Sequence, residues 1–214
     1  DHFDGENCKL LNLVIHNVPG TGIGSWKETG GTEIYGCRIF NNGYIDTDRG
    51  HGPAFYVQNS KNETRLLENN IVFNNYYKGF EIWSANTAAT SQYVKNVSVV
   101  GNTVFNSYAP SGGWKDNIFI GSNDNNGINR ATNILVRNNT LYHNTDFTVN
   151  GTLNEGPSLT VGWNANAPVT DITIDSNLII GRNGGLRFLY ADSLQFKYNT
   201  VFSRYMHINE GNIT

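Results

Sequence analysis

The sequence predicts an all-β protein: a right-handed parallel β-helix of about seven coils, each with three short strands, enclosing a ladder of asparagines. The first observation is a recurring slot followed by an apolar triplet, and the second is an aliphatic residue three positions before the slot. The third is that loops of variable length separate the repeats. The slot residues are Asn12, Cys37, Asn70, Asn102, Asn139, Asn177 and Asn199.

The two strands on either side of the slot follow from these patterns. The triplets stand in NLVIHN, CRIFNN, NIVFNN, NTVFNS, NTLYHN, NLIIGR and NTVFSR. The preceding strand is marked by Ile34, Leu67, Val99, Val136, Ile174 and Phe196, and the first turn is shifted there by about one residue. Helical repeats have a fixed period and an apolar spacing of about 3.6 residues, so they are excluded.

Asparagine suits a turn position because it tolerates the left-handed backbone conformation. We expect its amide to bond the next asparagine along the stack, which would satisfy polar groups that face the interior. The asparagines are therefore structural.

A third strand precedes each new coil, in AFYVQ, GFEIW, NIFIG, SLTVG and LRFLY. Its alternation directs Phe55/Val57, Phe80/Ile82, Ile118/Ile120, Leu159/Val161 and Leu186/Phe188 inward. The outward row is then Tyr56, Glu81, Phe119, Thr160 and Arg187.

Composition limits the class of protein. The chain has 214 residues, of which 38% are hydrophobic and 15% are charged, with a formal net charge of −3. It fits a single domain over 1–214, or a segment of a longer chain. Nucleic-acid binding would call for a basic face, and no apolar run is long enough for membrane insertion. Cys8 and Cys37 are too few for a disulfide framework, and we expect them to be small buried side chains.

Long loops flank the third strand on both sides and predict a groove along its outer face. They are NGYIDTDRGHGP, SYAPSGGWKD and TDFTVNGTLNEGP before it, and SANTAATSQ, GSNDNNGINRATN and WNANAPVT after it. Aromatic rings beside charged groups are typical of a sugar-binding surface, so a polysaccharide is the expected partner. The expected substrate-binding residues are Trp83, Phe119, Arg187, Gln58 and Lys115.

The loop DTDRGHG enters this face and supplies the candidate chemistry. The candidate catalytic residues are His51, Lys78, Tyr56, Glu81 and Arg49. For β-elimination on a uronate, His51 or Lys78 is the candidate base, Tyr56 the acid, and Arg49 or Arg187 the cation that neutralises the carboxylate.

Hydrolysis needs two carboxylates instead, which Glu81 with Asp46, Asp48 or Asp116 could supply. We expect no cofactor or metal, and Asp46 and Asp48 are expected to be solvated turn acids. Calcium on these two residues is the alternative, although it would need further oxygen ligands.

The repeat resembles the right-handed parallel β-helix repeat family, which includes polysaccharide lyases, some glycoside hydrolases and uronan epimerases. Over roughly the first 110 residues, segments such as NLVIHN, GTGIGSW and DRGHGPAFYVQN are similar to a group of mostly uncharacterised bacterial β-helix proteins. Their loop has R-G-H-G-H-G before I-Y-x-Q-N, and their next coil has G-I-H. The matching positions are Arg49, Gly50, His51, Gly52, Tyr56, Gln58 and Asn59.

Two positions depart from that pattern: Pro53 replaces the second histidine, and Glu81 replaces the histidine one coil later. A histidine cluster is therefore not implied here. Gly50-His51-Gly52 also resembles polygalacturonase-like hydrolases, but the preceding coil, GTGIGSWKE, lacks their paired aspartates, which rejects that assignment.

Two kinds of function remain. One is an enzyme that cleaves an acidic polysaccharide, by β-elimination ahead of hydrolysis. The other is a non-catalytic, glycan-binding or adhesive rod of a surface protein, whose open ends would make capping or end-to-end contacts with other chains. Either implies a secreted or cell-surface bacterial protein.

Overall fold

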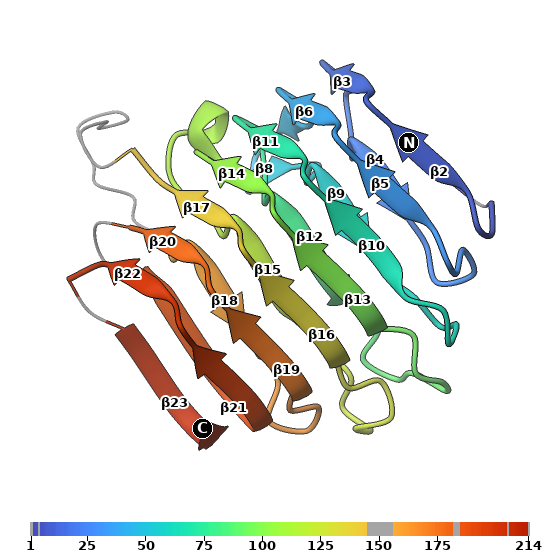
Figure 1. Cartoon of the computed structure of the whole chain (residues 1–214), viewed down its shortest axis with the longest axis vertical. Coiled ribbons are helices and arrows are strands. Elements are labelled where there is room, and N and C mark those ends of the chain that lie inside the picture. Colours follow the sequence, from blue (N-terminus) through green and yellow to red (C-terminus); the bar gives the residue numbers. More distant parts are fainter. Residues whose placement is uncertain (1, 4, 145–155, 182–184, 205, 214) are drawn as a thin grey trace.

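The computed structural model describes residues 2–3, 5–144, 156–181, 185–204 and 206–213, and over these residues the protein is all-β with long parallel sheets (Figure 1). The chain runs repeatedly through three sets of strands. The first set is β2 (Lys9–Leu11), β5 (Glu33–Tyr35), β10 (Arg65–Glu68), β13 (Lys95–Val100), β16 (Thr132–Arg137) and β19 (Thr170–Asp175). The second is β3 (Val14–His16), β6 (Arg38–Phe40), β11 (Ile71–Phe73), β14 (Thr103–Phe105), β17 (Thr140–Tyr142), β20 (Leu178–Ile180) and β22 (Thr200–Phe202).

The third set carries the outer face on which the site lies. It is β1 (His2–Phe3), β4 (Ile23–Ser25), β9 (Phe55–Val57), β12 (Phe80–Ser84), β15 (Ile118–Ser122) and β18 (Leu159–Val161). The long β21 (Leu186–Lys197) pairs with both β18 and β19, so the first and third sets form one 14-stranded sheet that folds back on itself. The last strand, β23 (Met206–Ile213), pairs with β21.

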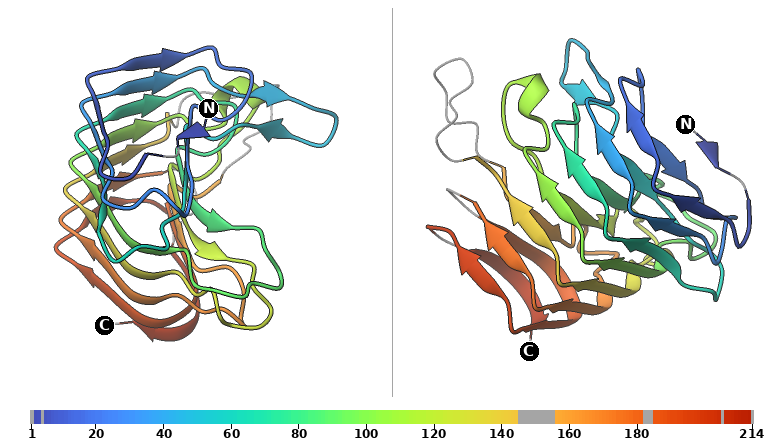
Figure 2. Two further views of the ribbon diagram at one scale, coloured as in Figure 1. Left: turned by 90° about the vertical axis from the view of Figure 1, so that its right-hand side faces the viewer. Right: turned by 45° about the horizontal axis from the view of Figure 1, so that its top comes forward.

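The three sets surround a common apolar interior, as the two views in Figure 2 show. Ile34 and Leu67 from the first set, Ile39 from the second and Phe55 and Phe80 from the third are all fully buried. Residues at equivalent positions of successive coils stack in register, because parallel pairing places each side chain directly over the next. The rings of Phe55 and Phe80, for example, lie 4.5 Å apart and nearly parallel.

The asparagine ladder is present as predicted. Each side-chain amide donates to the amide oxygen of the next, at 3.0, 3.0, 2.9 and 2.9 Å. The ladder members are Asn70, Asn102, Asn139, Asn177 and Asn199. Cys37 extends the ladder by donating its backbone N–H to Asn70.

Two details of the predicted turn are wrong. The ladder asparagines do not have positive φ; the left-handed residue is the one before each of them, such as Asn69 or Asn138. The first turn is also shifted, because Val14 pairs with Arg38 and Ile15 with Ile39, which places Leu13 in the ladder slot and Asn12 in the left-handed position. In pairs such as Asn69-Asn70 and Asn138-Asn139, the sequence does not indicate which asparagine is left-handed and which belongs to the ladder.

One buried charge was not expected. Arg65 begins β10 and is fully buried, where it donates to the hydroxyl of Ser25 and to the carbonyl and hydroxyl oxygens of Thr29. No described carboxylate pairs with it, and burial lowers its guanidinium pKa to about 10. The cysteines are both free; Cys37 is buried as predicted, whereas Cys8 is half-buried. Within the described residues, no helix is long and apolar enough to cross a bilayer.

Candidate functional site

The outer face of the third strand set carries a groove of about 550 Å³. It is lined by strand residues of β9, β12 and β15 and by loop residues that overhang them. The lining residues are Arg49, His51, Gly52, Pro53, Tyr56, Tyr77, Lys78, Glu81, Trp83, Ala85, Lys115, Phe119 and Trp163.

The strand residues of the groove belong to one register row. Glu81 pairs with Tyr56 on one side and with Phe119 on the other, and the row continues through Thr160 to Arg187. The alternation predicted from the sequence is therefore confirmed, and its inward partners are buried in the core. The row is not an open platform, however, because Glu81, Phe119 and Thr160 are themselves buried.

At the floor of the groove, Lys78 and Glu81 form an ion pair of 2.7 Å between Nζ and Oε1. Both residues are almost fully buried, with 7% and 6% of their surface exposed. Burial alone would lower the pKa of Lys78, but the carboxylates of Glu81 and Asp116 raise it above its usual value. Lys78 is thus a permanently protonated cation at neutral pH, a state that disfavours the role of base.

Aromatic rings surround this cation. The Lys78 ammonium lies 3.6 Å from the ring centre of Phe119 and 4.9 Å from that of Tyr77, in the range of cation–π contacts. Trp83 and Trp163 pack edge to face at 6.0 Å. Gly121 lies against both: a Cβ there would lie 3.3 Å from a side-chain atom of each tryptophan, a tight contact.

Three further cations gather around the groove, and each lies over an aromatic ring. Arg49 lies over Tyr77, Lys115 over Tyr108 and Arg187 over Trp163, at 5.4, 5.4 and 5.9 Å. Burial is the largest cause that lowers the pKa of Lys115, and the charges of Lys78, Arg49 and Arg187 lower it further. Carboxylates partly compensate these cations: Arg49 pairs with Asp48 at 3.7 Å, and Asp116 lies near Lys115.

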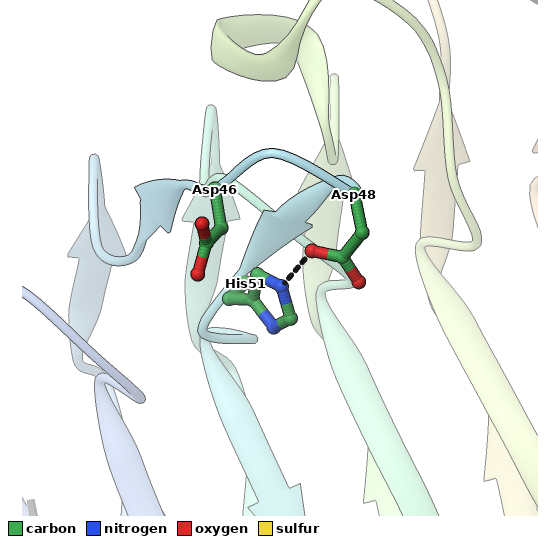
Figure 3. Close-up of side chains that lie close together, drawn as sticks. All are labelled: Asp46, Asp48 and His51. Atoms are coloured by element: carbon green, nitrogen blue, oxygen red, sulfur yellow. Dashed lines mark hydrogen bonds and ion pairs between the residues drawn. The ribbon is translucent and has the colours of Figure 1, made fainter.

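His51 lies at the rim on a short antiparallel hairpin of β7 (Tyr44–Ile45) and β8 (Gly50–His51). Its Nε2 is 2.8 Å from Oδ1 of Asp48 (Figure 3). The imidazole ring stacks on Tyr44, with 5.2 Å between the ring centres. The hydrogen bond to His51 lowers the pKa of Asp48. An ionised Asp48 selects the tautomer with the proton on Nε2, which leaves Nδ1 as a proton acceptor.

Asp46, Asp48 and His51 are also the described group that could hold a metal ion, since their ligand atoms lie within 4.8 Å of one another (Figure 3). Two carboxylates and one imidazole are too few oxygens for calcium, which takes about six to eight. The hydrogen bond between His51 and Asp48 accounts for the position of those two side chains.

Tyr56, on β9, pairs with Glu81 of β12, and its ring packs against that of Trp26 at 5.2 Å. Burial, and then the negative charge of Glu81, raise the pKa of its phenol well above the usual value. Tyr56 therefore keeps its proton across the physiological range and can donate it.

Most of the predicted site residues converge on this groove. The eight that line it are His51, Lys78, Tyr56, Glu81, Arg49, Trp83, Phe119 and Lys115. Gln58 lies outside the groove, where its amide donates to the backbone oxygen of Trp83 at 3.1 Å. Arg187 lines a second cavity of about 290 Å³ that also contains Lys115 and Asp116.

The two cavities adjoin, because Lys115 lines both of them. Asp116, in the second cavity, accepts a hydrogen bond from the Thr160 hydroxyl. Five lining residues were not among the predicted site residues: Gly52, Pro53, Tyr77, Ala85 and Trp163. Tyr77 directly precedes Lys78, and Trp163 begins one of the loops predicted to border the groove, so the signals were present. Comparisons with protein-family models, curated proteins and solved structures give no match.

Proposed function

We propose that this protein is a right-handed parallel β-helix of about seven coils that binds an acidic polysaccharide in the groove and cleaves it by β-elimination. The observation that supports it best is the convergence of Arg49, Lys78 and Lys115 with aromatic rings on one concave surface. Cations attract and hold uronate carboxylates, and rings offer flat faces to sugars. A polysaccharide substrate implies a secreted or cell-surface protein.

In the proposed reaction, Nδ1 of His51 removes the proton from the carbon beside the uronate carboxyl group. The electron pair of that C–H bond forms a carbon–carbon double bond, and the glycosidic C–O bond on the adjacent carbon breaks. Tyr56 gives its proton to the departing oxygen. Asp48 is a positioning residue, because it holds the imidazole in the required tautomer.

Arg49 and Lys115 are the cations that stabilise the negative charge that develops on the carboxylate. Lys78 contributes positive potential from the floor, but its ion pair with Glu81 fits a fixed charge better than a base. The same ion pair disfavours hydrolysis, since that reaction needs Glu81 as an available acid or nucleophile.

The test is incubation of the protein with polygalacturonate, alginate, hyaluronan and chondroitin sulfate, followed by the absorbance of the unsaturated product. His51→Ala should abolish turnover and Asp48→Asn should reduce it, while both retain binding. His16→Ala is a matched control, because this histidine stacks on Phe40 in the second strand set, away from the groove residues.

Binding without turnover across the panel would establish the non-catalytic alternative, a glycan-binding rod. New reducing ends without the unsaturated product would instead establish hydrolysis. Absence of binding to every member would refute the proposal as a whole.

A further inference from the structure

A third cavity, of about 410 Å³, lies at the turn that follows the second strand set. We infer that it is a separate binding site for a neutral oligosaccharide, independent of the acidic substrate proposed for the groove. Its volume falls in the range usual for small-ligand sites, about 300–1,000 Å³. The lining residues are Asn41, Asn74, Asn106, Ala109, Pro110, Trp114 and Asn144.

Stacked asparagines form one wall. Asn41, Asn74 and Asn106 each directly follow the last residue of β6, β11 and β14, which pair in register. Parallel pairing places them about 4.8 Å apart, so they offer a regular row of amides. Asn106 accepts the backbone N–H of Asn144 at 2.9 Å, which ties the fourth amide residue to the row.

The backbone alone does not require asparagine here. All three row residues have positive φ, between 51° and 55°, a conformation that glycine adopts equally well. The position directly before each ladder residue is also left-handed, and it is asparagine in some coils, as at Asn69, and glycine in others, as at Gly36 and Gly101. At the cavity, by contrast, each of the three positions retains a side chain that can donate and accept hydrogen bonds.

The opposite wall is apolar and firmly anchored. It comes from the 3₁₀ turn η1 (Ala109–Ser111) and from Trp114. The turn is anchored by a hydrogen bond of 2.8 Å from the Tyr108 N–H to the Asn75 oxygen and one of 2.7 Å from the Ser111 hydroxyl to the Tyr76 oxygen. The cavity is therefore preformed.

The chemistry of the lining selects the ligand. None of the described residues that line the cavity is charged, so there is no group to pair with an anion or a cation. Amides match hydroxyl groups in both directions, since each offers two donors and one acceptor oxygen. Among the described residues, the side-chain amides of Asn41 and Asn74 make no hydrogen bond, so they can bond a ligand. An apolar wall facing a row of amides thus fits an uncharged sugar chain.

The experiment is calorimetric titration of the protein with cello-, xylo-, manno- and malto-oligosaccharides. At least one should bind, and Asn41→Gly and Asn74→Gly should each weaken that binding about five- to tenfold, the effect of losing one net hydrogen bond. Glycine removes the amide and keeps the left-handed backbone, so both variants should fold.

Asn69→Gly is the matched control, with the same substitution and a φ of 55° at the other turn, and it should bind like the wild type. His51→Ala, which changes the groove at its rim, should also leave neutral binding unchanged, which separates this site from the groove. The inference is overturned if no neutral oligosaccharide binds, if neither cavity variant weakens binding, or if Asn69→Gly or His51→Ala weakens it equally. Failure to act on acidic polysaccharides would refute the proposed function and leave this result standing.

Discussion

The ion pair at the floor of the groove should show strong energetic coupling between its two members. Lys78→Met leaves the Glu81 carboxylate buried and without its partner, and Glu81→Gln does the same to the Lys78 ammonium. Breaking a buried pair in this way costs about 3–5 kcal/mol. Lys78 keeps Asp116 and the Phe119 ring nearby, so we place Glu81→Gln at about 3 kcal/mol.

The double variant should cost about the same as either single variant, because it leaves neither member of the pair unpaired but deprives the buried Asp116 of the Lys78 cation. Two single losses of about 3 kcal/mol would add to about 6 kcal/mol, so the coupling free energy should be about 3 kcal/mol, the upper end for residues in contact. The measurement is the free energy of unfolding in urea at neutral pH for the wild type, both single variants and the double variant.

The exposed pair of Lys9 and Glu33 is the control, since its Nζ–Oε2 distance of 2.6 Å is as short but its side chains are 62% and 25% exposed. Its coupling, measured with Lys9→Met and Glu33→Gln, should be at most about 1 kcal/mol. Additive losses for the buried pair, with coupling below about 0.5 kcal/mol, would refute the reasoning that burial gives this pair its strength.

Three further predictions concern stability. Asp124→Ala should lower the free energy of unfolding in urea by about 3 kcal/mol, because Asp124 accepts hydrogen bonds from four backbone N–H groups. Asp124→Asn should lower it less, and equal losses for the two variants would contradict this. By the same measurement, Asn102→Leu should cost about 3 kcal/mol and Asn199→Leu about 1 kcal/mol, because Asn102 has a ladder neighbour on both sides. A larger loss for Asn199→Leu would contradict the stabilising role of the ladder. The raised pKa values of Lys78 and Tyr56 mean that the folded state retains protons that the unfolded state releases, so stability should be complete below about pH 10 and fall above it. Thermal melts from pH 8 to pH 11 test this, and a Tm that rises over this range would refute it.

The strand sets could be predicted from the sequence because their signals are local. An apolar residue at alternate positions places its side chain inside whatever the loops do, and parallel stacking then aligns equivalent residues. This is why the row from Tyr56 to Arg187 is as predicted, and why Lys78 and Glu81 could be selected together.

Which residues stack follows from local sequence, because strand alternation and the repeated asparagine act over a few neighbouring positions. What covers those residues depends on the fold. Lys78 and Glu81 are only three positions apart, but the sequence does not show that their ion pair is buried. Arg65 carries a charged side chain at the start of a strand, yet it is enclosed by Ser25 and Thr29 from far earlier in the chain. Burial depends on such distant segments, and no local pattern encodes it.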